Sequence, residues 1–196
     1  MRAEPTVIAG QLVRLVPLTL GHVDALCECG LDPAIWTWMP MRVRDMNAMS
    51  AFVQEALESQ RAGAALPFAM MLQETGQVIG STRFMNIAPA HRRVEIGGTW
   101  IAPAWQRTRV NTETKYLMLR HAFEHWNCMR VELKTDARNA VSRAAILRLG
   151  AVEEGTFRKH MLLADGSIRD SVYFSIVDDE WPTVKVMLAA KLGQQS

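Results

Sequence analysis

The stretch of sequence that most restricts the fold runs from residue 94 to residue 135. Val94–Ala102 is strand-like, a polar loop follows it, and from about Thr112 to Trp126 apolar residues recur at helical spacing. Arg130–Thr135 (RVELKT) then alternates polar and apolar residues, which predicts another strand. Two strands joined through a helix need a crossover connection, so this unit predicts a parallel pair within a sheet.

The other predicted elements place this unit after a meander of strands. No repeat, low-complexity tract or linker interrupts the chain, so residues 1–196 are predicted to form one domain. The fold class is α/β (α+β): a mixed, mostly antiparallel twisted sheet with helices on both faces. The remaining elements are predicted as strands at Leu12–Leu18, Pro67–Gln73 and Gln77–Asn86, helices at Gly21–Gly30, Asp45–Ala62 and Ala140–Leu149, a hairpin at Glu153–Leu163 and Ile168–Ile176, and a C-terminal helix near Asp178.

Composition excludes several broad classes of protein. The formal net charge is +2, which is too balanced for a general nucleic-acid or membrane-surface binder. The sequence MRAEPTVIAG has no apolar signal region, and no stretch approaches the roughly 18 apolar residues of a membrane span. Cys27, Cys29 and Cys128 form no disulfide framework, so we expect a cytoplasmic protein.

The polar loop Gln106–Thr112 is rich in hydrogen-bond donors. Asn111 is a plausible N-cap, and the first N–H groups of the helix that follows have no intrahelical partner. With Arg107 and Arg109 nearby, the loop predicts a phosphate site. It lacks the Gly-Lys-Ser/Thr of a nucleotide-binding P-loop, and the alternative is a solvated connection without a ligand.

An ordered set of segments resembles the GNAT family of acyl-CoA N-acyltransferases, and most of all its branch of RimJ/RimL-like ribosomal-protein N-terminal acetyltransferases. The set comprises VEIGGTWIAPAW, the loop QRTRVN, Asn139-Ala140-Val141-Ser142 opening a helix that ends LRLGA, and the final EEGTFRKHMLLADGSIRDSVYFSI. The resemblance spans Leu12 to Trp181. It implies acetyl-CoA (coenzyme A) as co-substrate, no metal, and cofactor contacts from Trp100, Ile101, Ala102, Gln106, Arg107, Thr108, Arg109, Val110, Asn111, Thr112, Asn139 and Ser142.

The loop departs from the family pattern at two positions. Arg109 stands where glycine is usual, and Asn111 stands where glycine or alanine is usual. If the family glycine has a positive φ angle, arginine there costs on the order of 1 kcal/mol. A charge-assisted bond from Arg109 to a phosphate would offset a similar amount, so we expect Arg109 to help bind the cofactor.

Direct acyl transfer needs a base for the amine, a donor to the oxyanion and a proton for the leaving thiolate. Glu95 is the predicted base, and Gly97-Gly98 beyond it favours a bulge or a splayed strand. A structural ion pair with Arg93 or Arg83 is the alternative for Glu95, and His91 is a second candidate base. Many family members carry a tyrosine donor at the position of Ile146.

Because isoleucine cannot donate a proton, the resemblance points instead to Ser142 as the group that helps the thiolate leave. Asn139 would then contact the pantetheine or the pyrophosphate. Helix capping by Asn139 is the alternative that requires no ligand.

The acceptor is predicted to be a primary amine: a peptide N-terminus, an amino acid or a small amine. Its pocket is expected between the early helices and the final hairpin, where Arg158 and Phe174 are further candidates. The alternative for the run IWTWMPM in the early helices is a place in the hydrophobic core. A homodimer is possible because two-fold pairs are the commonest assembly. The candidate acceptor-binding residues are Trp36, Trp38, Met39 and Tyr173.

Two other functions compete with the transferase. His121, Glu124 and His125 fit the H-x-x-E-H pattern of inverted zinc proteases, although no third ligand is apparent downstream. A non-catalytic module that binds coenzyme A would explain the altered loop and the missing tyrosine.

Overall fold

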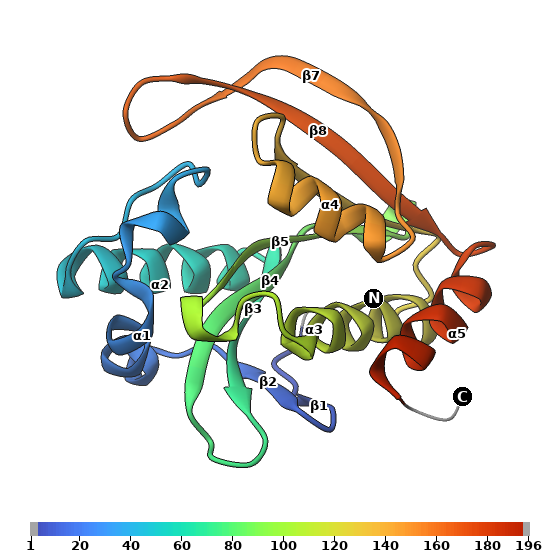
Figure 1. Cartoon of the computed structure of the whole chain (residues 1–196), viewed down its shortest axis with the longest axis horizontal. Coiled ribbons are helices and arrows are strands. Elements are labelled where there is room, and N and C mark those ends of the chain that lie inside the picture. Colours follow the sequence, from blue (N-terminus) through green and yellow to red (C-terminus); the bar gives the residue numbers. More distant parts are fainter. Residues whose placement is uncertain (1–3, 194–196) are drawn as a thin grey trace.

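Eight strands form one sheet in the order β1-β2-β3-β4-β5-β6-β8-β7 in the computed structural model, which describes residues 4–193. Neighbouring strands are antiparallel except for β5 and β6, which are parallel as predicted from the crossover (Figure 1). The elements are β1 (Ile8–Ala9), β2 (Val13–Pro17), α1 (Val23–Gly30), α2 (Met46–Arg61), β3 (Ala65–Leu72), β4 (Val78–Ala88), β5 (Arg93–Ile101), α3 (Arg109–Arg120), β6 (Arg130–Asp136), α4 (Ala140–Arg148), β7 (Val152–Leu162), β8 (Ile168–Val177) and α5 (Trp181–Leu192).

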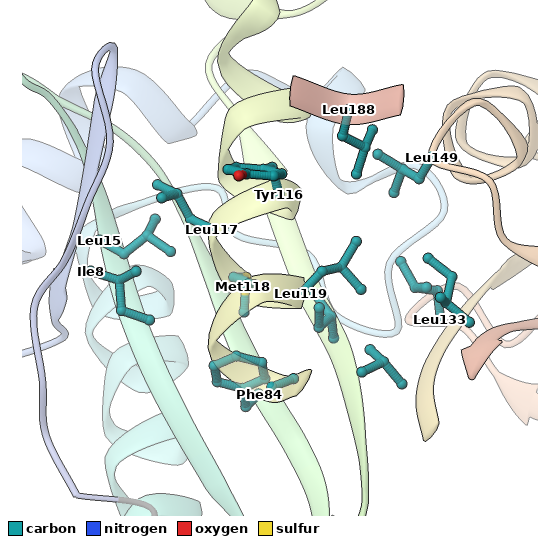
Figure 2. Packing of buried hydrophobic residues seen from close by; sticks show 14 of the residues in the cluster. Ile8, Leu15, Phe84, Tyr116, Leu117, Met118, Leu119, Leu133, Leu149 and Leu188 are labelled. Carbon is teal, nitrogen blue, oxygen red and sulfur yellow. The ribbon is translucent and has the colours of Figure 1, made fainter. Parts of the chain in front are cut away.

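Two hydrophobic cores lie on opposite faces of the sheet, as the predicted helices on both faces require. The larger core joins α3, α4 and α5 to one face, and the smaller joins α1 and α2 to the other. Figure 1 shows α1 and α2 together at one side of the molecule and α3, α4 and α5 at the other. Figure 2 shows Leu117 and Leu119 leaving α3 in opposite directions, Leu117 toward Leu15 of β2 and Leu119 toward Leu133 of β6.

The boundaries of α3 differ from the prediction at both ends. The helix begins at Arg109, because Thr108 has an extended backbone and its hydroxyl accepts a hydrogen bond from the N–H of Val110. The predicted N-cap at Asn111 is therefore wrong, and Asn111 lies in the first turn. After Arg120 the chain continues as a π-helix, His121–His125. Strand β1, which has only two residues, was not predicted.

Strands β5 and β6 pair over three residues only and then separate. Their register joins Arg93–Glu95 to Arg130–Glu132, after which β5 stays with β4 and β6 stays with β8. At the point of separation, Thr82 of β4 faces both Gly98 and Thr99, and Gly98 has a φ of 57°. This is the bulge that Gly97-Gly98 predicted, and the opening between residues 96–101 and residues 133–136 is called the fork below.

The carboxylate of Glu113 ties α3 to the turn between β1 and β2. It accepts hydrogen bonds from the N–H groups of Gln11, Leu12 and Val13 at 2.9, 2.7 and 2.8 Å. A Cβ atom at Gly10 would lie 2.7 Å from Glu113 Cδ, so only glycine leaves room for the carboxylate. The turn therefore forms around a charged group that belongs to the helix behind it. Within residues 4–193 there is also no helix long and apolar enough to cross a membrane.

Replacing Glu113 with glutamine should destabilise the fold. The amide keeps one acceptor oxygen and brings a donor against backbone N–H groups, so we expect a loss of about 3 kcal/mol in the free energy of unfolding. Chemical denaturation would measure it, with Glu28→Gln on the exposed side of α1 as the control. Equal stability of the two variants would contradict the role given to Glu113.

Candidate functional site

Two helices begin at the open end of the fork. Because β5 and β6 are parallel, their carboxyl ends lie at the same edge of the sheet, and α3 and α4 each follow one of them. The N-termini of both helices therefore converge there with their unpaired N–H groups and positive dipole ends. This arrangement suits an anion between α3 and α4, as the sequence predicted for the loop.

The loop before α3 is held in place by its own polar side chains. Gln106 Nε2 donates to the carbonyl of Ile101 at 2.9 Å, and Thr108 Oγ1 donates to the carbonyl of Trp105 at 2.8 Å. Both bonds are internal to the loop and the end of β5. The N–H of Val110 is bonded to Thr108 Oγ1, so the first-turn amides of α3 that remain for an anion at the open end of the fork are those of Arg109 and Asn111.

The two loop arginines differ in backbone and in contacts. Arg107 has a φ of 60°, whereas Arg109 is the first residue of α3. The backbone strain considered for Arg109 is therefore absent at that residue, because the left-handed position in the loop is Arg107. Arg109 Nη1 donates to the carbonyl of Leu192 at 3.3 Å, joining α3 to the end of α5. Arg107 is exposed, and the described part of the chain contains no hydrogen bond or ion pair from its guanidinium.

Of the three predicted cofactor contacts Trp100, Ile101 and Ala102, only Ile101 directs its backbone N–H and C=O groups toward the fork. The N–H of Ala102 donates to the carbonyl of Ile79 at 2.8 Å, so Ala102 faces β4. In an antiparallel ladder the direction alternates, which turns Trp100 toward β4 as well and Ile101 toward the fork. The N–H of Ile101 is therefore the amide available to a ligand there, while its carbonyl is held by Gln106.

Glu95 lies where β5 and β6 part, with its side chain on the face of the sheet opposite α3. It is 1% exposed, and its Oε2 accepts from Asn86 Nδ2 at 2.7 Å and from Lys134 Nζ at 2.9 Å. The expectation of an arginine partner is wrong, because Arg93 pairs with Glu132 and Arg83 with Glu55. Glu95 is also not at a sheet edge, since β5 is an inner strand.

A pocket of about 580 Å³ opens beside Glu95 on that same face. Tyr173, predicted to contact the acceptor, lines it with Phe157, and their ring centroids are 4.5 Å apart. His160 packs against both rings, and burial together with Lys134 and Arg169 lowers the pKa of His160 below its ordinary value. The lining residues are Asn86, Ile87, Ala88, Arg93, Glu95, Arg130, Glu132, Glu154, Gly155, Phe157 and Tyr173.

Charged residues missed in the sequence alternate along β6 on the pocket face. Arg130, Glu132 and Lys134 are separated by the buried Val131 and Leu133, so period-two alternation in RVELKT could have placed them beside Glu95. Arg130 pairs with Glu154 of β7 and lowers the pKa of that carboxyl to about 2.

The predicted acceptor residues of the early helices do not line the pocket beside Glu95. Trp36 is 2% exposed, packs against the rings of Phe52 and Trp100, and donates to the carbonyl of Gly30. It is therefore a core residue and is not part of the proposed acceptor site. Met39 is half-buried against the smaller core. Trp38 lies under the guanidinium of Arg138, 5.0 Å from the ring centroid.

The hairpin candidates divide in the same way. Phe174 is fully buried in the larger core, on the opposite face from Tyr173, so it cannot line the pocket. Arg158 lines a separate pocket of about 360 Å³ with Asp136, Arg138 and Asp170.

Residues proposed for proton transfer have contrasting surroundings. Ser142 is half-buried in the first turn of α4, where its N–H donates to Asn139 Oδ1 at 3.0 Å, so Asn139 is the N-cap. Ile146 is buried in the larger core one turn later. His91 is exposed in the turn before β5 and does not line the pocket beside Glu95.

The residues of the zinc alternative have other contacts. Glu124 Oε1 accepts from Trp181 Nε1 at 3.0 Å and from Lys185 Nζ at 2.8 Å, so it serves the packing of α5. His121 stacks among Phe84, His125 and Trp126, and burial lowers its pKa to about 4. Across residues 4–193, no three His, Cys, Asp or Glu side chains form a group that could hold a metal ion.

Comparison with known proteins gives a consistent result. Residues 13–152 match the family described as the acetyltransferase (GNAT) domain. The solved structure of a GCN5-related N-acetyltransferase from Brucella melitensis is 30% identical, covers 95% of this chain and 85% of that one, and superposes with a TM-score of 0.88. An uncharacterised N-acetyltransferase of Bacillus licheniformis, p20, is 26% identical over 165 residues, which is 84% of this chain and 92% of that protein. The Bacillus subtilis (strain 168) protein YdaF, provisionally named a ribosomal N-acetyltransferase, is 32% identical over 106 residues, 54% of this chain and 57% of that protein.

Replacing Arg107 and Arg109 with glycine, one at a time, should distinguish a role in cofactor binding from a role in stability. Arg107→Gly relieves the left-handed backbone but removes a free guanidinium, so we expect coenzyme A to bind about 5-fold more weakly, for a loss of about 1 kcal/mol. Arg109→Gly should weaken binding less, because Arg109 already contacts α5, and should lower stability instead. Calorimetric titration with coenzyme A measures the first effect and thermal unfolding the second. Tighter binding by Arg107→Gly would contradict a role for that side chain.

Proposed function

Because the chain belongs to the GNAT acetyltransferase family, we propose that it transfers the acetyl group of acetyl-CoA directly to the primary amine of a peptide N-terminus. The observation that carries the proposal is the fork, which has two helix N-termini on one face of the sheet and a pocket containing Glu95 on the other. A donor and an acceptor entering from opposite faces would meet where β5 and β6 part. Direct transfer needs this arrangement and no covalent enzyme intermediate.

The residues at the helix side fit the chemistry of coenzyme A. A pyrophosphate needs backbone N–H donors and positive charge, which the first turn of α3 and Arg107 supply. The amide-containing pantetheine arm needs an unpaired strand edge, which β5 supplies at Ile101. The other candidate contacts are the predicted residues from Gln106 to Thr112, together with Asn139 and Ser142 at the start of α4.

Glu95 is the proposed base for the acceptor amine. Lys134 and Asn86 hold one carboxylate oxygen in place, and the carboxylate borders the pocket through which an amine would approach. The neutral amine attacks the thioester carbonyl, and Glu95 accepts the one proton that the nitrogen loses as the amide forms. We assign the N–H of Ile101 to the oxyanion, and Ser142 to a hydrogen bond that helps the thiolate leave.

The pocket supports a peptide amine as acceptor. Phe157 and Tyr173 offer a wall for the first side chain. The ion-paired Arg130 and Glu154 beside them offer polar partners for a peptide backbone, which a small amine lacks. The likeness to YdaF, provisionally named a ribosomal N-acetyltransferase, adds weight to a protein N-terminus over a free amino acid or a small amine.

The test is acetyl transfer from acetyl-CoA to a panel of peptides that differ in the N-terminal residue, beside free amino acids and polyamines. Mass spectrometry would identify the acetylated product, and thiol release would give the rate. Transfer to peptides but not to small amines is the expected result. Binding of coenzyme A without transfer to any amine would instead identify a non-catalytic binding module.

Replacing Glu95 with glutamine should lower kcat/KM by about 100-fold, the lower end of the usual contribution of a general base. The amide keeps the shape of the side chain, so coenzyme A affinity should not change. Glu58→Gln on the exposed face of α2 is the control. A fall in melting temperature without a fall in kcat/KM would show that Glu95 is purely structural.

A further inference from the structure

Lys115 of α3 is a buried amine to which the proposed reaction gives no role. It is 6% exposed, and its Nζ donates to Thr99 Oγ1 at 2.5 Å. Thr99 Oγ1 lies 2.7 Å from Thr82 Oγ1, which in turn donates to Met118 Sδ at 3.5 Å. The chain of bonds ends at a thioether, so it fixes the position of the amine without drawing its proton away.

The amine lies in the fork. Lys115 is one helical turn before Leu119, so the two side chains leave α3 on the same flank, and Figure 2 shows Leu119 directed toward Leu133 of β6. Thr99, which holds the tip of Lys115, belongs to the bulge and lies four residues after Glu95, the last residue of β5 paired with β6. Lys115 therefore reaches the sheet where β5 and β6 have separated, on the face that carries α3 and α4.

Charged groups on the surrounding elements have other partners. Glu113 of α3 binds the backbone of residues 11–13, and Glu95 of β5 is paired with Lys134 of β6. Asp136, at the end of β6, is paired with Arg138. Among the described residues no carboxylate is bonded to Lys115, and burial alone lowers the pKa of its ammonium to about 7.

An ammonium group has three N–H donors, and Thr99 accepts only one of them. Buried donors are normally satisfied, so the other two point to a ligand atom in the fork. An electron-rich sulfur or oxygen arriving there during the reaction would supply such an acceptor.

We propose that Lys115 is the proton donor to the sulfur atom of the departing coenzyme A, a role that rests on the proposed transferase function. Ile146 cannot fill it, and Ser142 is an alcohol whose proton is held far more strongly, so Ser142 can assist the thiolate by a hydrogen bond only. As the acceptor nitrogen bonds to the acyl carbon, the C–S bond breaks and its electron pair goes to sulfur. Sulfur takes the proton from Lys115 Nζ, the surplus proton of the nitrogen passes to Glu95, and Lys115 regains a proton from solvent before the next cycle.

Lys115→Met is the principal test, because it replaces a desolvated cation with an apolar chain of similar length and should not impair folding. The wild type should lose kcat/KM as pH rises above about 7, where Lys115 becomes neutral. In Lys115→Met we expect kcat/KM about 100-fold lower and no such alkaline loss. Lys115→Arg keeps the charge but holds its proton too tightly to donate it, so it should stay closer to the methionine variant in rate.

A second readout needs no acceptor. Ultraviolet absorbance of the thiolate reports the pKa of the thiol of bound coenzyme A, which a nearby ammonium should lower in the wild type and not in Lys115→Met. Lys185→Met on α5 is the control for loss of a lysine elsewhere and should leave both readouts at wild-type values.

An alkaline loss and a thiol titration that persist in Lys115→Met would overturn the assignment while leaving the transferase function intact. A wild type that binds coenzyme A but acetylates no amine would overturn the proposed function, and the role of Lys115 with it. Loss of both signals in Lys115→Met, with coenzyme A still bound, is the supporting result.

Discussion

The separation of β5 from β6 after Glu95 is the constraint on which the rest of the site depends. Inner strands of a sheet normally satisfy backbone N–H and C=O groups on both sides, and here two neighbours each give up one side. The chain compensates in part, since the side chain of Gln106 occupies the carbonyl of Ile101. What is left unpaired is the polar edge that an extended, amide-containing ligand can complete. The bulge at Gly98 aids this separation by turning β5 away from β6.

The two faces of the sheet at the fork carry different chemical groups. Helices α3 and α4 bring positive helix ends and Lys115 to one face, while β6, β7 and β8 bring carboxylates and aromatic rings to the other. Glu95 and Lys115 lie on opposite faces of the sheet. Lys115 contacts Thr99, which is only four residues after Glu95 along β5. The proposed base and the proposed acid are thus separated by the sheet and cannot form an ion pair with each other.

Much of the fold could be predicted because it follows from local patterns. The period-two alternation in RVELKT, the helical spacing after the loop and the Gly97-Gly98 pair led to β6, α3 and the bulge. Features that depend on distant register could not be predicted in this way. The pairing of Glu95 with Lys134, 39 residues later, and the burial of Trp36 both arise from which segments become neighbours in space. The error at Asn111 is of another kind, since Thr108 is also a favourable cap and the backbone angles place the start of the helix there.

The three hydrogen bonds that the Glu113 carboxylate accepts from residues 11–13 affect the order in which the chain can fold during synthesis. The amides of residues 11–13 leave the ribosome before their carboxylate, which follows at a separation of 102 positions from Gln11. Until it arrives, the turn between β1 and β2 holds three N–H groups without their final acceptor and must stay hydrated. The β1–β2 hairpin is thus made well before α3, yet it can be completed only together with that helix.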